Sequence, residues 1–227
     1  MNLKLTMKVR KAMGFQQKGE TAEAMKLYEE AVQEGLEDPR PILSYCVLLI
    51  RDYQFQKARE LLVKIQNRPM SEDEKIQLYV NYACCVYKLG EQQKGLELLE
   101  RQSEKHPCGL IYETLGYLYV DAGDAEKALS YNLKALEYDD EDSIVLDNLG
   151  QTYYRLLGDK ASAREYFDKA IAQRPGQIDT LYFLAQYDIE AGDKAAAKEK
   201  LERALEGRFS PLNYATKESI QKVLNTL

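Results

Sequence analysis

Six small residues recur along the chain at an almost constant spacing, and this spacing constrains the fold more than any other feature. Intervals of 34, 37, 33, 35 and 34 residues separate Ala24, Ala58, Gly95, Ala128, Ala163 and Ala197. A period of this size is typical of stacked helical hairpins. Because such a hairpin cannot bury its apolar face alone, we expect neighbouring hairpins to stack on one another.

The clearest unit begins at Ser143 and shows why each repeat is expected to contain two helices. Small and apolar residues at positions 146, 149, 150 and 153 lie on one helical stripe. Gly158 is placed to end that helix in the left-handed conformation. A second stripe then runs from Ala163 to Ala170, and Pro175 breaks the chain.

The motif Leu149-Gly150-x-x-Tyr153, followed by Ala163-x-x-x-Phe167 and then by proline, resembles the tetratricopeptide repeat. The resemblance implies an all-α fold, a right-handed superhelical solenoid of antiparallel helix-turn-helix repeats. It predicts a single superhelix over residues 1–227, with repeats at about 5–38, 39–75, 76–108, 109–142, 143–177 and 178–211.

The two ends differ from the inner repeats, as terminal repeats should. The first helix carries four cations, Lys4, Lys8, Arg10 and Lys11, so we expect one of its faces to be exposed to solvent. The tail at about 214–227 is predicted to be a capping helix on the sixth hairpin. Its apolar stripe consists of Ile220, Val223, Leu224 and Leu227.

Tetratricopeptide stacks generally bind partners on a concave face lined by the first helix of each hairpin. The resemblance therefore implies a peptide-binding groove at Arg51, Asn81, Tyr87, Lys88, Tyr117, Asp147, Asn148, Gln151, Tyr154, Arg155, Tyr182, Phe183 and Gln186, with Leu43, Ser44 and Val47 nearby. The amides of Asn81 and Asn148 can both donate to and accept from a partner's backbone. Alternatively, this face is only solvated and its tyrosines fill gaps between hairpins.

One known way of binding peptides is disfavoured. Some members of the family hold a C-terminal carboxylate with a Lys, Asn, Asn, Lys, Arg set spread over three repeats. The corresponding positions of the first three repeats are occupied by Val9, Met13, Ser44, Gln77 and Asn81. We therefore do not expect a receptor for chaperone tails of that type.

The sequence predicts no catalytic, cofactor or metal site, and hence no enzyme. Residues 14–21 nearly spell a phosphate-binding loop, but Glu20 stands where lysine is needed and no strand precedes it. Adjacent Cys84 and Cys85 diverge by about 100° on a helix, which does not suit metal binding. With His106 as the single histidine, a histidine-based nucleophile pair is also disfavoured.

Composition excludes several classes of partner. The chain has 31 basic and 37 acidic residues, a net charge of −6, and no basic stripe, so nucleic-acid binding is disfavoured. The longest apolar run, Ile42 to Ile50, is much shorter than the roughly 20 residues of a membrane span. The first residues lack the apolar region of a signal peptide. The four cysteines lack disulfide-framework spacing, which favours a reducing, cytoplasmic location.

These observations predict a non-enzymatic scaffold or adaptor that binds a peptide segment of a protein partner in its concave groove. Self-assembly into an oligomeric platform is one alternative, so homo-oligomerisation stays open. A regulatory module of a larger enzyme or signalling protein is another. The identity of the partner is not encoded in these patterns.

Overall fold

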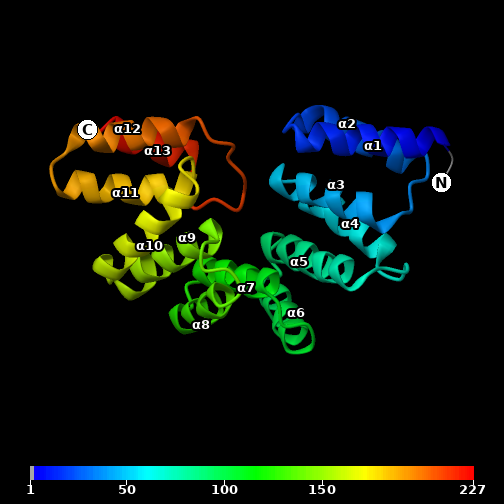
Figure 1. Cartoon of the computed structure of the whole chain (residues 1–227), viewed down its shortest axis with the longest axis horizontal. Coiled ribbons are helices and arrows are strands. Elements are labelled where there is room, and N and C mark those ends of the chain that lie inside the picture. Colours follow the sequence, from blue (N-terminus) through cyan, green and yellow to red (C-terminus); the bar gives the residue numbers. More distant parts are fainter. Residues whose placement is uncertain (1–2) are drawn as a thin grey trace. The chain divides into compact units, whose positions relative to one another are not determined.

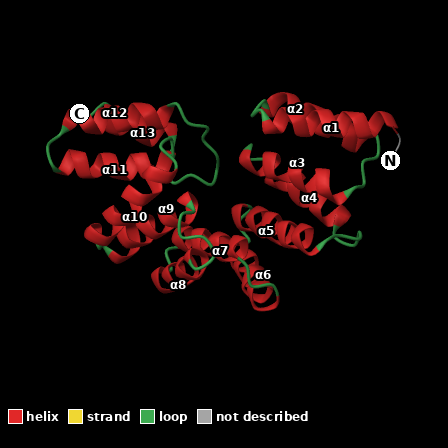
Figure 2. Ribbon diagram, viewed as in Figure 1, coloured by secondary structure: helices red, strands yellow, loops and turns green. Residues whose placement is uncertain are grey.

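The computed structural model describes residues 3–227, and every regular element in that range is a helix, with no strand (Figure 1, Figure 2). The all-α prediction is therefore confirmed. The helices are α1 (Leu3–Gln17), α2 (Thr21–Gln33), α3 (Pro39–Arg51), α4 (Phe55–Ile65), α5 (Glu72–Lys88), α6 (Gln92–Lys105), α7 (Gly109–Ala122), α8 (Ala125–Leu136), α9 (Ser143–Gln151), η1 (Thr152–Leu157), α10 (Lys160–Gln173), α11 (Ile178–Glu190), α12 (Lys194–Leu205) and α13 (Lys217–Leu224).

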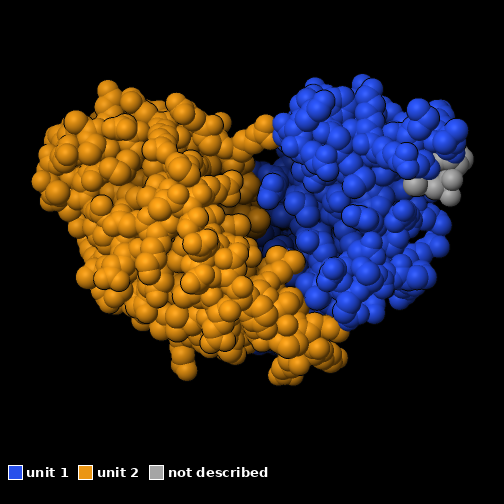
Figure 3. Space-filling model, viewed as in Figure 1, with its two compact units in different colours: residues 1–102 blue, residues 103–227 orange. Residues whose placement is uncertain are grey.

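Consecutive helices pair into hairpins, and the chain divides into two compact units (Figure 3). Unit 1 comprises residues 1–102 and unit 2 comprises residues 103–227. Within each unit, the first helices of successive hairpins touch, as α3 touches α5 and α7 touches α9. The expectation of one continuous superhelix stays a prediction. Among the described helices, none combines the length and apolarity that crossing a bilayer requires.

The turn inside each hairpin of unit 2 is made by a glycine and an aspartate. The glycines have positive φ angles: Gly123 (82°), Gly158 (69°) and Gly192 (82°). The side chains of the aspartates that follow them accept hydrogen bonds from the backbone N–H of Lys127, Ser162 and Ala196, respectively. The glycine thus ends one helix and the aspartate caps the next.

In unit 1 the same left-handed position is held by Gly19, Tyr53 and Gly90. Tyr53, with a φ of 62°, is the one non-glycine residue with positive φ among residues 3–227. A side chain in this conformation crowds its own carbonyl, so Tyr53 introduces local strain. Helix α5 of the same unit begins with a capping box. The Ser71 Oγ accepts from the Glu74 N–H, and the Glu74 carboxylate accepts from the Ser71 N–H.

Small residues sit where two helices of a hairpin approach most closely, as the repeat pattern predicted. A Cβ atom added to Gly150 would lie 2.5 Å from the ring of Phe167 on α10. A Cβ added to Gly116 would lie 2.0 Å from the side-chain oxygen of Asn132 on α8. Both contacts are far inside van der Waals distance, so these positions require glycine.

The first helix of the fifth hairpin changes from α to π geometry, with α9 leading directly into η1. Four residues separate Tyr153 from Gly158, whereas three separate the equivalent Tyr119 from Gly123. A π turn holds one more residue than an α turn. The wider turn therefore absorbs the inserted residue before Gly158 ends the helix.

Candidate functional site

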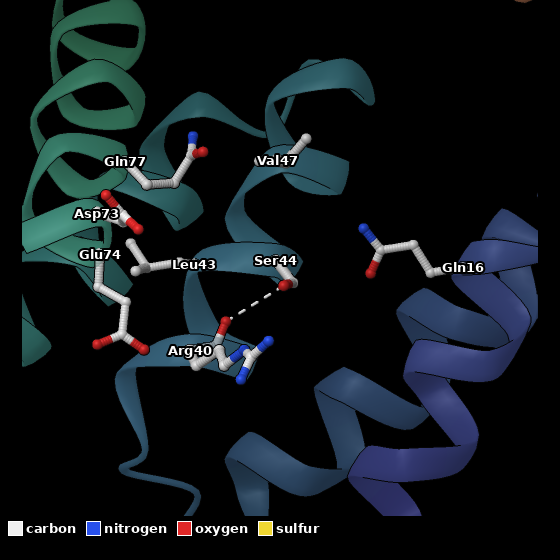
Figure 4. Close-up of a pocket in the computed structure, with 8 residues that line it drawn as sticks. All are labelled: Gln16, Arg40, Leu43, Ser44, Val47, Asp73, Glu74 and Gln77. Atoms are coloured by element: carbon white, nitrogen blue, oxygen red, sulfur yellow. Dashed lines mark hydrogen bonds between the residues drawn. The ribbon is translucent and has the colours of Figure 1, made fainter. Parts of the chain in front are cut away.

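An open pocket with a volume of about 230 Å³ lies in unit 1, on helices that are each the first of their hairpin (Figure 4). Its lining consists of Gln16 from α1, Arg40, Leu43, Ser44 and Val47 from α3, and Asp73, Glu74 and Gln77 from α5. The three expected positions Leu43, Ser44 and Val47 are thus brought together at one hollow of the surface.

The pocket combines apolar and charged surface. Leu43 is buried and Val47 half-buried, so they supply apolar contact area. Arg40 on α3 and Asp73 on α5 are exposed, and Glu74 beside Asp73 is half-buried. Figure 4 shows the two carboxylates together on the α5 side of the pocket. The lining therefore offers one cation and two anions around an apolar floor.

Three neutral polar side chains of the pocket are held in place by hydrogen bonds within the chain. Ser44 Oγ donates to the Arg40 carbonyl (3.2 Å; Figure 4), and the Gln16 side-chain oxygen accepts from the Tyr28 hydroxyl (2.8 Å). Gln77 Nε2 donates to the Asn81 side-chain oxygen (2.8 Å). Each amide has both a donor and an acceptor end, so Gln16 and Gln77 retain capacity for another molecule.

The other groove residues predicted in unit 1 do not line this pocket. Arg51 is exposed, Lys88 is half-buried, and Asn81 and Tyr87 are buried. Tyr87 packs where α5 meets α6, since a Cβ on Gly95 would lie 3.2 Å from the Tyr87 Cβ. This tyrosine therefore packs between the two helices of its own hairpin.

The two predicted amide contacts bond to the chain itself. Asn81 Nδ2 donates to the Leu43 carbonyl and Asn148 Nδ2 donates to the Glu113 carbonyl, each at 3.4 Å. Both asparagines are buried. In each case the amide joins a first helix to the first helix of the preceding hairpin. Their hydrogen bonds therefore tie hairpins together, and the expectation that they also face a partner's backbone stays a prediction.

Unit 2 buries two carboxylates on the corresponding helices. The oxygens of Asp147 on α9 accept from Thr180 Oγ1 (2.5 Å) and from Gln151 Nε2 (2.7 Å). Arg155 Nη1, in η1, donates to the side-chain oxygen of Gln151 (2.9 Å). Burial, together with the nearby charge of Asp179 on α11, raises the pKa of Asp147 to about 7.

Residues of the loop between α12 and α13 donate hydrogen bonds to the Asp179 carboxylate. We call this loop, residues 206–216, the strap; it is the long orange segment of Figure 1. Asp179 Oδ1 accepts from the Ala215 N–H (2.8 Å), and Oδ2 accepts from the Tyr214 N–H (3.0 Å) and from Asn213 Nδ2 (3.2 Å). Burial raises the pKa of Asp179, which these hydrogen bonds partly offset.

The ring of Tyr214 lies on residues that were predicted to hold a partner. It stacks on the Phe183 ring with centroids 5.2 Å apart, and the Arg155 guanidinium carbon is 4.0 Å from its centroid. Tyr182 lies at 6.1 Å. The strap therefore occupies part of the predicted groove.

The remaining predicted positions of unit 2 divide by exposure. Asp147, Asn148, Gln151 and Phe183 are buried, whereas Tyr117, Tyr154, Arg155, Tyr182 and Gln186 are half-buried. Tyr154 contacts the rings of Phe183 and Tyr187, at 5.1 and 5.6 Å. Gln186 Nε2 donates to the Tyr182 carbonyl of its own helix (3.3 Å). The contacts of Tyr214 and Asn213 were missed, because the irregular strap has no periodicity that would place it.

Stacked helical hairpins with small residues at each crossing define a helical repeat protein. The family model described as Tetratricopeptide repeat matches residues 9–112, and a second model of the same description matches residues 110–142 and 145–177. The chain therefore belongs to the tetratricopeptide repeat family. Such repeats generally mediate protein–protein interactions.

Solved structures agree with this fold. A chain of the APC/C hetero-tetramer Cut9–Hcn1 is similar with a TM-score of 0.73 and 12% identity over 98% of this chain, which spans 42% of that chain. PilW, a type IV pilus biogenesis factor, is similar with a TM-score of 0.67 and 18% identity. That match covers 99% of this chain and 100% of the PilW chain. MamA from Desulfovibrio magneticus RS-1 is similar with a TM-score of 0.56 and 21% identity. That match covers 78% of this chain and 98% of the MamA chain. No curated protein matches the sequence.

Proposed function

We propose that this protein is a non-enzymatic scaffold or adaptor that binds a short extended segment of a partner protein. The observation that carries the proposal is the pocket of unit 1, which three successive first helices build together. That is the face on which the family resemblance places a partner. A cytoplasmic location belongs to the same proposal, since the four free cysteines suit a reducing compartment.

The chemistry of the pocket favours a segment with an apolar side chain between charged neighbours. The apolar residue would contact Leu43 and Val47, an acidic neighbour would face Arg40, and a basic neighbour would face Asp73. The volume of about 230 Å³ is below the roughly 300–1,000 Å³ typical of small-molecule sites. It suits the anchoring of one side chain within a longer contact.

Within unit 1, we propose that the longer contact extends to exposed Arg51 and half-buried Lys88. Unit 2 has accessible predicted positions of its own, half-buried Tyr117, Tyr154 and Gln186, which we propose as contacts made by that unit. Tyrosine supplies amphipathic contact area at low entropic cost, which suits an interface.

The test is a peptide array followed by titration of a binding peptide into variants of the full chain. We expect Arg40→Glu to weaken binding of an acidic-flanked peptide by about ten-fold, the size of one lost charge contact. Lys64→Glu on α4 is the matched control, because it makes the same charge change on an exposed second-helix position. Unchanged affinity in both Arg40→Glu and Val47→Ala, with helicity intact, would move the site elsewhere.

Self-association is a second candidate, favoured by the exposed apolar edge of α1. Leu3 is 77% exposed and Met7 is 63% exposed, and they lie four residues apart on one helical face. If copies associate through this edge, light scattering will show an oligomer that Leu3→Lys with Met7→Lys dissolves. A wild-type monomer at high concentration would remove this candidate.

A further inference from the structure

The strap of unit 2 contacts the protein as a bound peptide would. Its backbone donates two consecutive N–H groups, of Tyr214 and Ala215, to the buried carboxylate of Asp179. Its aromatic ring lies against Phe183 and the Arg155 guanidinium. Main-chain hydrogen bonds combined with one anchored side chain are the usual components of peptide recognition.

Asn213 and Tyr214 of the strap lie outside the hydrophobic cluster that docks the C-terminal helix, whereas Ala215 is buried in that cluster and Phe209 packs against it. Ile220 of α13 is fully buried against Ala197, Leu201 and their neighbours, and Val223, Leu224 and Leu227 pack on the same cluster. Tyr214 remains 46% exposed and is not part of that cluster. The ring can therefore leave its place without removing α13 from the hydrophobic core.

We propose that the inner face formed by α9, η1 and α11 is a second peptide site, which the strap closes in the free chain. Its occupant is a partner segment with the chemistry of the strap. That segment presents an aromatic ring to Phe183 and Arg155, and two consecutive backbone N–H groups to Asp179. The inference goes beyond the pocket of unit 1 and fails or stands independently of it.

The chemistry of the site explains this selectivity. The Asp179 carboxylate is buried, so it needs donors whenever the strap is displaced, and a bent backbone like that of Tyr214 and Ala215 supplies them without any particular side chain. The guanidinium of Arg155 attracts the face of an aromatic ring. The π segment η1 positions Arg155, and π segments are frequent at functional sites.

Because the strap is tethered, an outside segment must compete with an effective local concentration in about the millimolar range. A partner therefore needs additional contacts, or a released strap, to bind. The site then discriminates against weak peptides that carry only the aromatic residue.

The test uses a fluorescent peptide with the sequence of residues 208–216, titrated into the full chain. We expect weak binding to the wild type and at least about ten-fold tighter binding to Asn213→Ala with Tyr214→Ala, which weakens the tethered competitor. Tyr138→Ala is the matched control, since it removes a tyrosine of similar exposure, 55%, elsewhere in unit 2. A probe with its tyrosine replaced by alanine should lose the gain, and so should the strap variant that also carries Arg155→Lys.

Equal probe affinity in the wild type and the folded strap variant would overturn the proposal. A wild-type dimer that the Tyr214→Ala change dissolves would also overturn it, because a second copy would then be the occupant.

Hydrogen exchange of the wild type tests the opening itself, even if the strap variant does not fold. We expect the Tyr214 and Ala215 amides to exchange through local opening, faster than the Leu149 amide in the core. Exchange of all three at one rate would show that the strap opens only by unfolding, which contradicts the proposal.

Discussion

Two pairs of carboxylates, one pair in each unit, are stabilised in opposite ways. In unit 1, Glu30 and Glu34 pair with Lys8 at the surface, and hydrogen bonds from this ammonium lower the pKa of both acids. In unit 2, Asp147 and Asp179 are buried, and burial raises both pKa values. The first pair of acids is therefore stabilised by a cation, and the second pair by hydroxyl, amide and backbone donors.

This difference teaches how one repeat architecture can build a face that is open or closed. Unit 1 has a pocket on its first helices, lined by charged and apolar residues. In unit 2 the corresponding helices bury two acids, and the donors to one of them, Asp179, come from the strap. The closed face depends on a segment outside the hairpins, so it should be the more sensitive to truncation.

Deleting residues 214–227 should have the largest effect and should separate the units. It removes fully buried Ile220 and deprives buried Asp179 of its two backbone donors, the N–H groups of Tyr214 and Ala215. We expect unit 2 to lose at least about 4 kcal/mol of stability. Hydrogen exchange read by peptide should show faster exchange in unit 2, with residues 3–88 unchanged. Unaltered exchange in α11 and α12 would show that the tail is dispensable.

We expect the second-largest loss of stability from Gly150→Leu. The added side chain collides with the ring of Phe167, so we expect a cost of about 3 kcal/mol. Gly14→Ala in unit 1 is the matched control. No heavy atom lies within 4 Å of its added Cβ, and alanine favours a helix interior by up to about 1 kcal/mol. A variant Gly150→Leu that unfolds at the wild-type denaturant concentration would contradict the helix pairing at residues 143–173.

Acidification should stabilise unit 2 before it affects unit 1. Asp147 and Glu113 have pKa values raised to about 7, above their unfolded values, so unit 2 binds protons on folding. The stabilisation from protonation is present at low pH and is lost as the pH rises through about 7. We therefore expect the melting temperature of unit 2 to rise between pH 8 and pH 5.5, and Asp147→Asn to reduce that rise.

Unit 1 supplies the contrast in the same titration. The lowered pKa values of Glu30 and Glu34 imply stability that is lost only as the pH falls below the ordinary glutamate value, through the folded pKa values. Between pH 8 and pH 5.5, exchange within α1 and α2 should therefore stay constant after correction for intrinsic rates. Parallel changes in both units would break the comparison.

The smallest effect concerns the turn of the second hairpin. Tyr53→Gly relieves the left-handed strain, so we expect unit 1 to gain up to about 1 kcal/mol in chemical denaturation. Gly90→Ala is the reciprocal change, at a φ of 94° with open space around the added Cβ, and should cost about the same. A loss of stability in Tyr53→Gly would mean that the exposed ring contacts of Tyr53 outweigh its strain.

Local structure followed from local sequence. The capping box at Ser71 and the close approach at Gly150 each depend on residues within one or two helices, and their patterns identified them. The third hairpin nevertheless begins at Glu72, earlier than the expected residue 76. The capping-box residues Ser71 and Glu74 mark that start, whereas the repeat period alone places it too late.

The site was harder to predict because it depends on which neighbour satisfies each polar group. The sequence indicates that the Asn148 amide can bond to a backbone group. It does not indicate that this group is the Glu113 carbonyl. Similarly, Asp179 and Tyr214 are joined across the whole sixth hairpin by an irregular loop. Periodicity identifies faces of helices, whereas these pairings are decided by packing in three dimensions.

The π segment η1 has a consequence for how such arrays change in length. An extra residue in an ordinary helix would rotate everything after it by about 100° and turn the buried stripe to solvent. Here the widened turn confines the insertion between Tyr153 and Gly158, and α10 still presents Ala163 and Phe167 to the core. The π segment therefore allows a repeat to grow by one residue while the neighbouring helices keep their packing register.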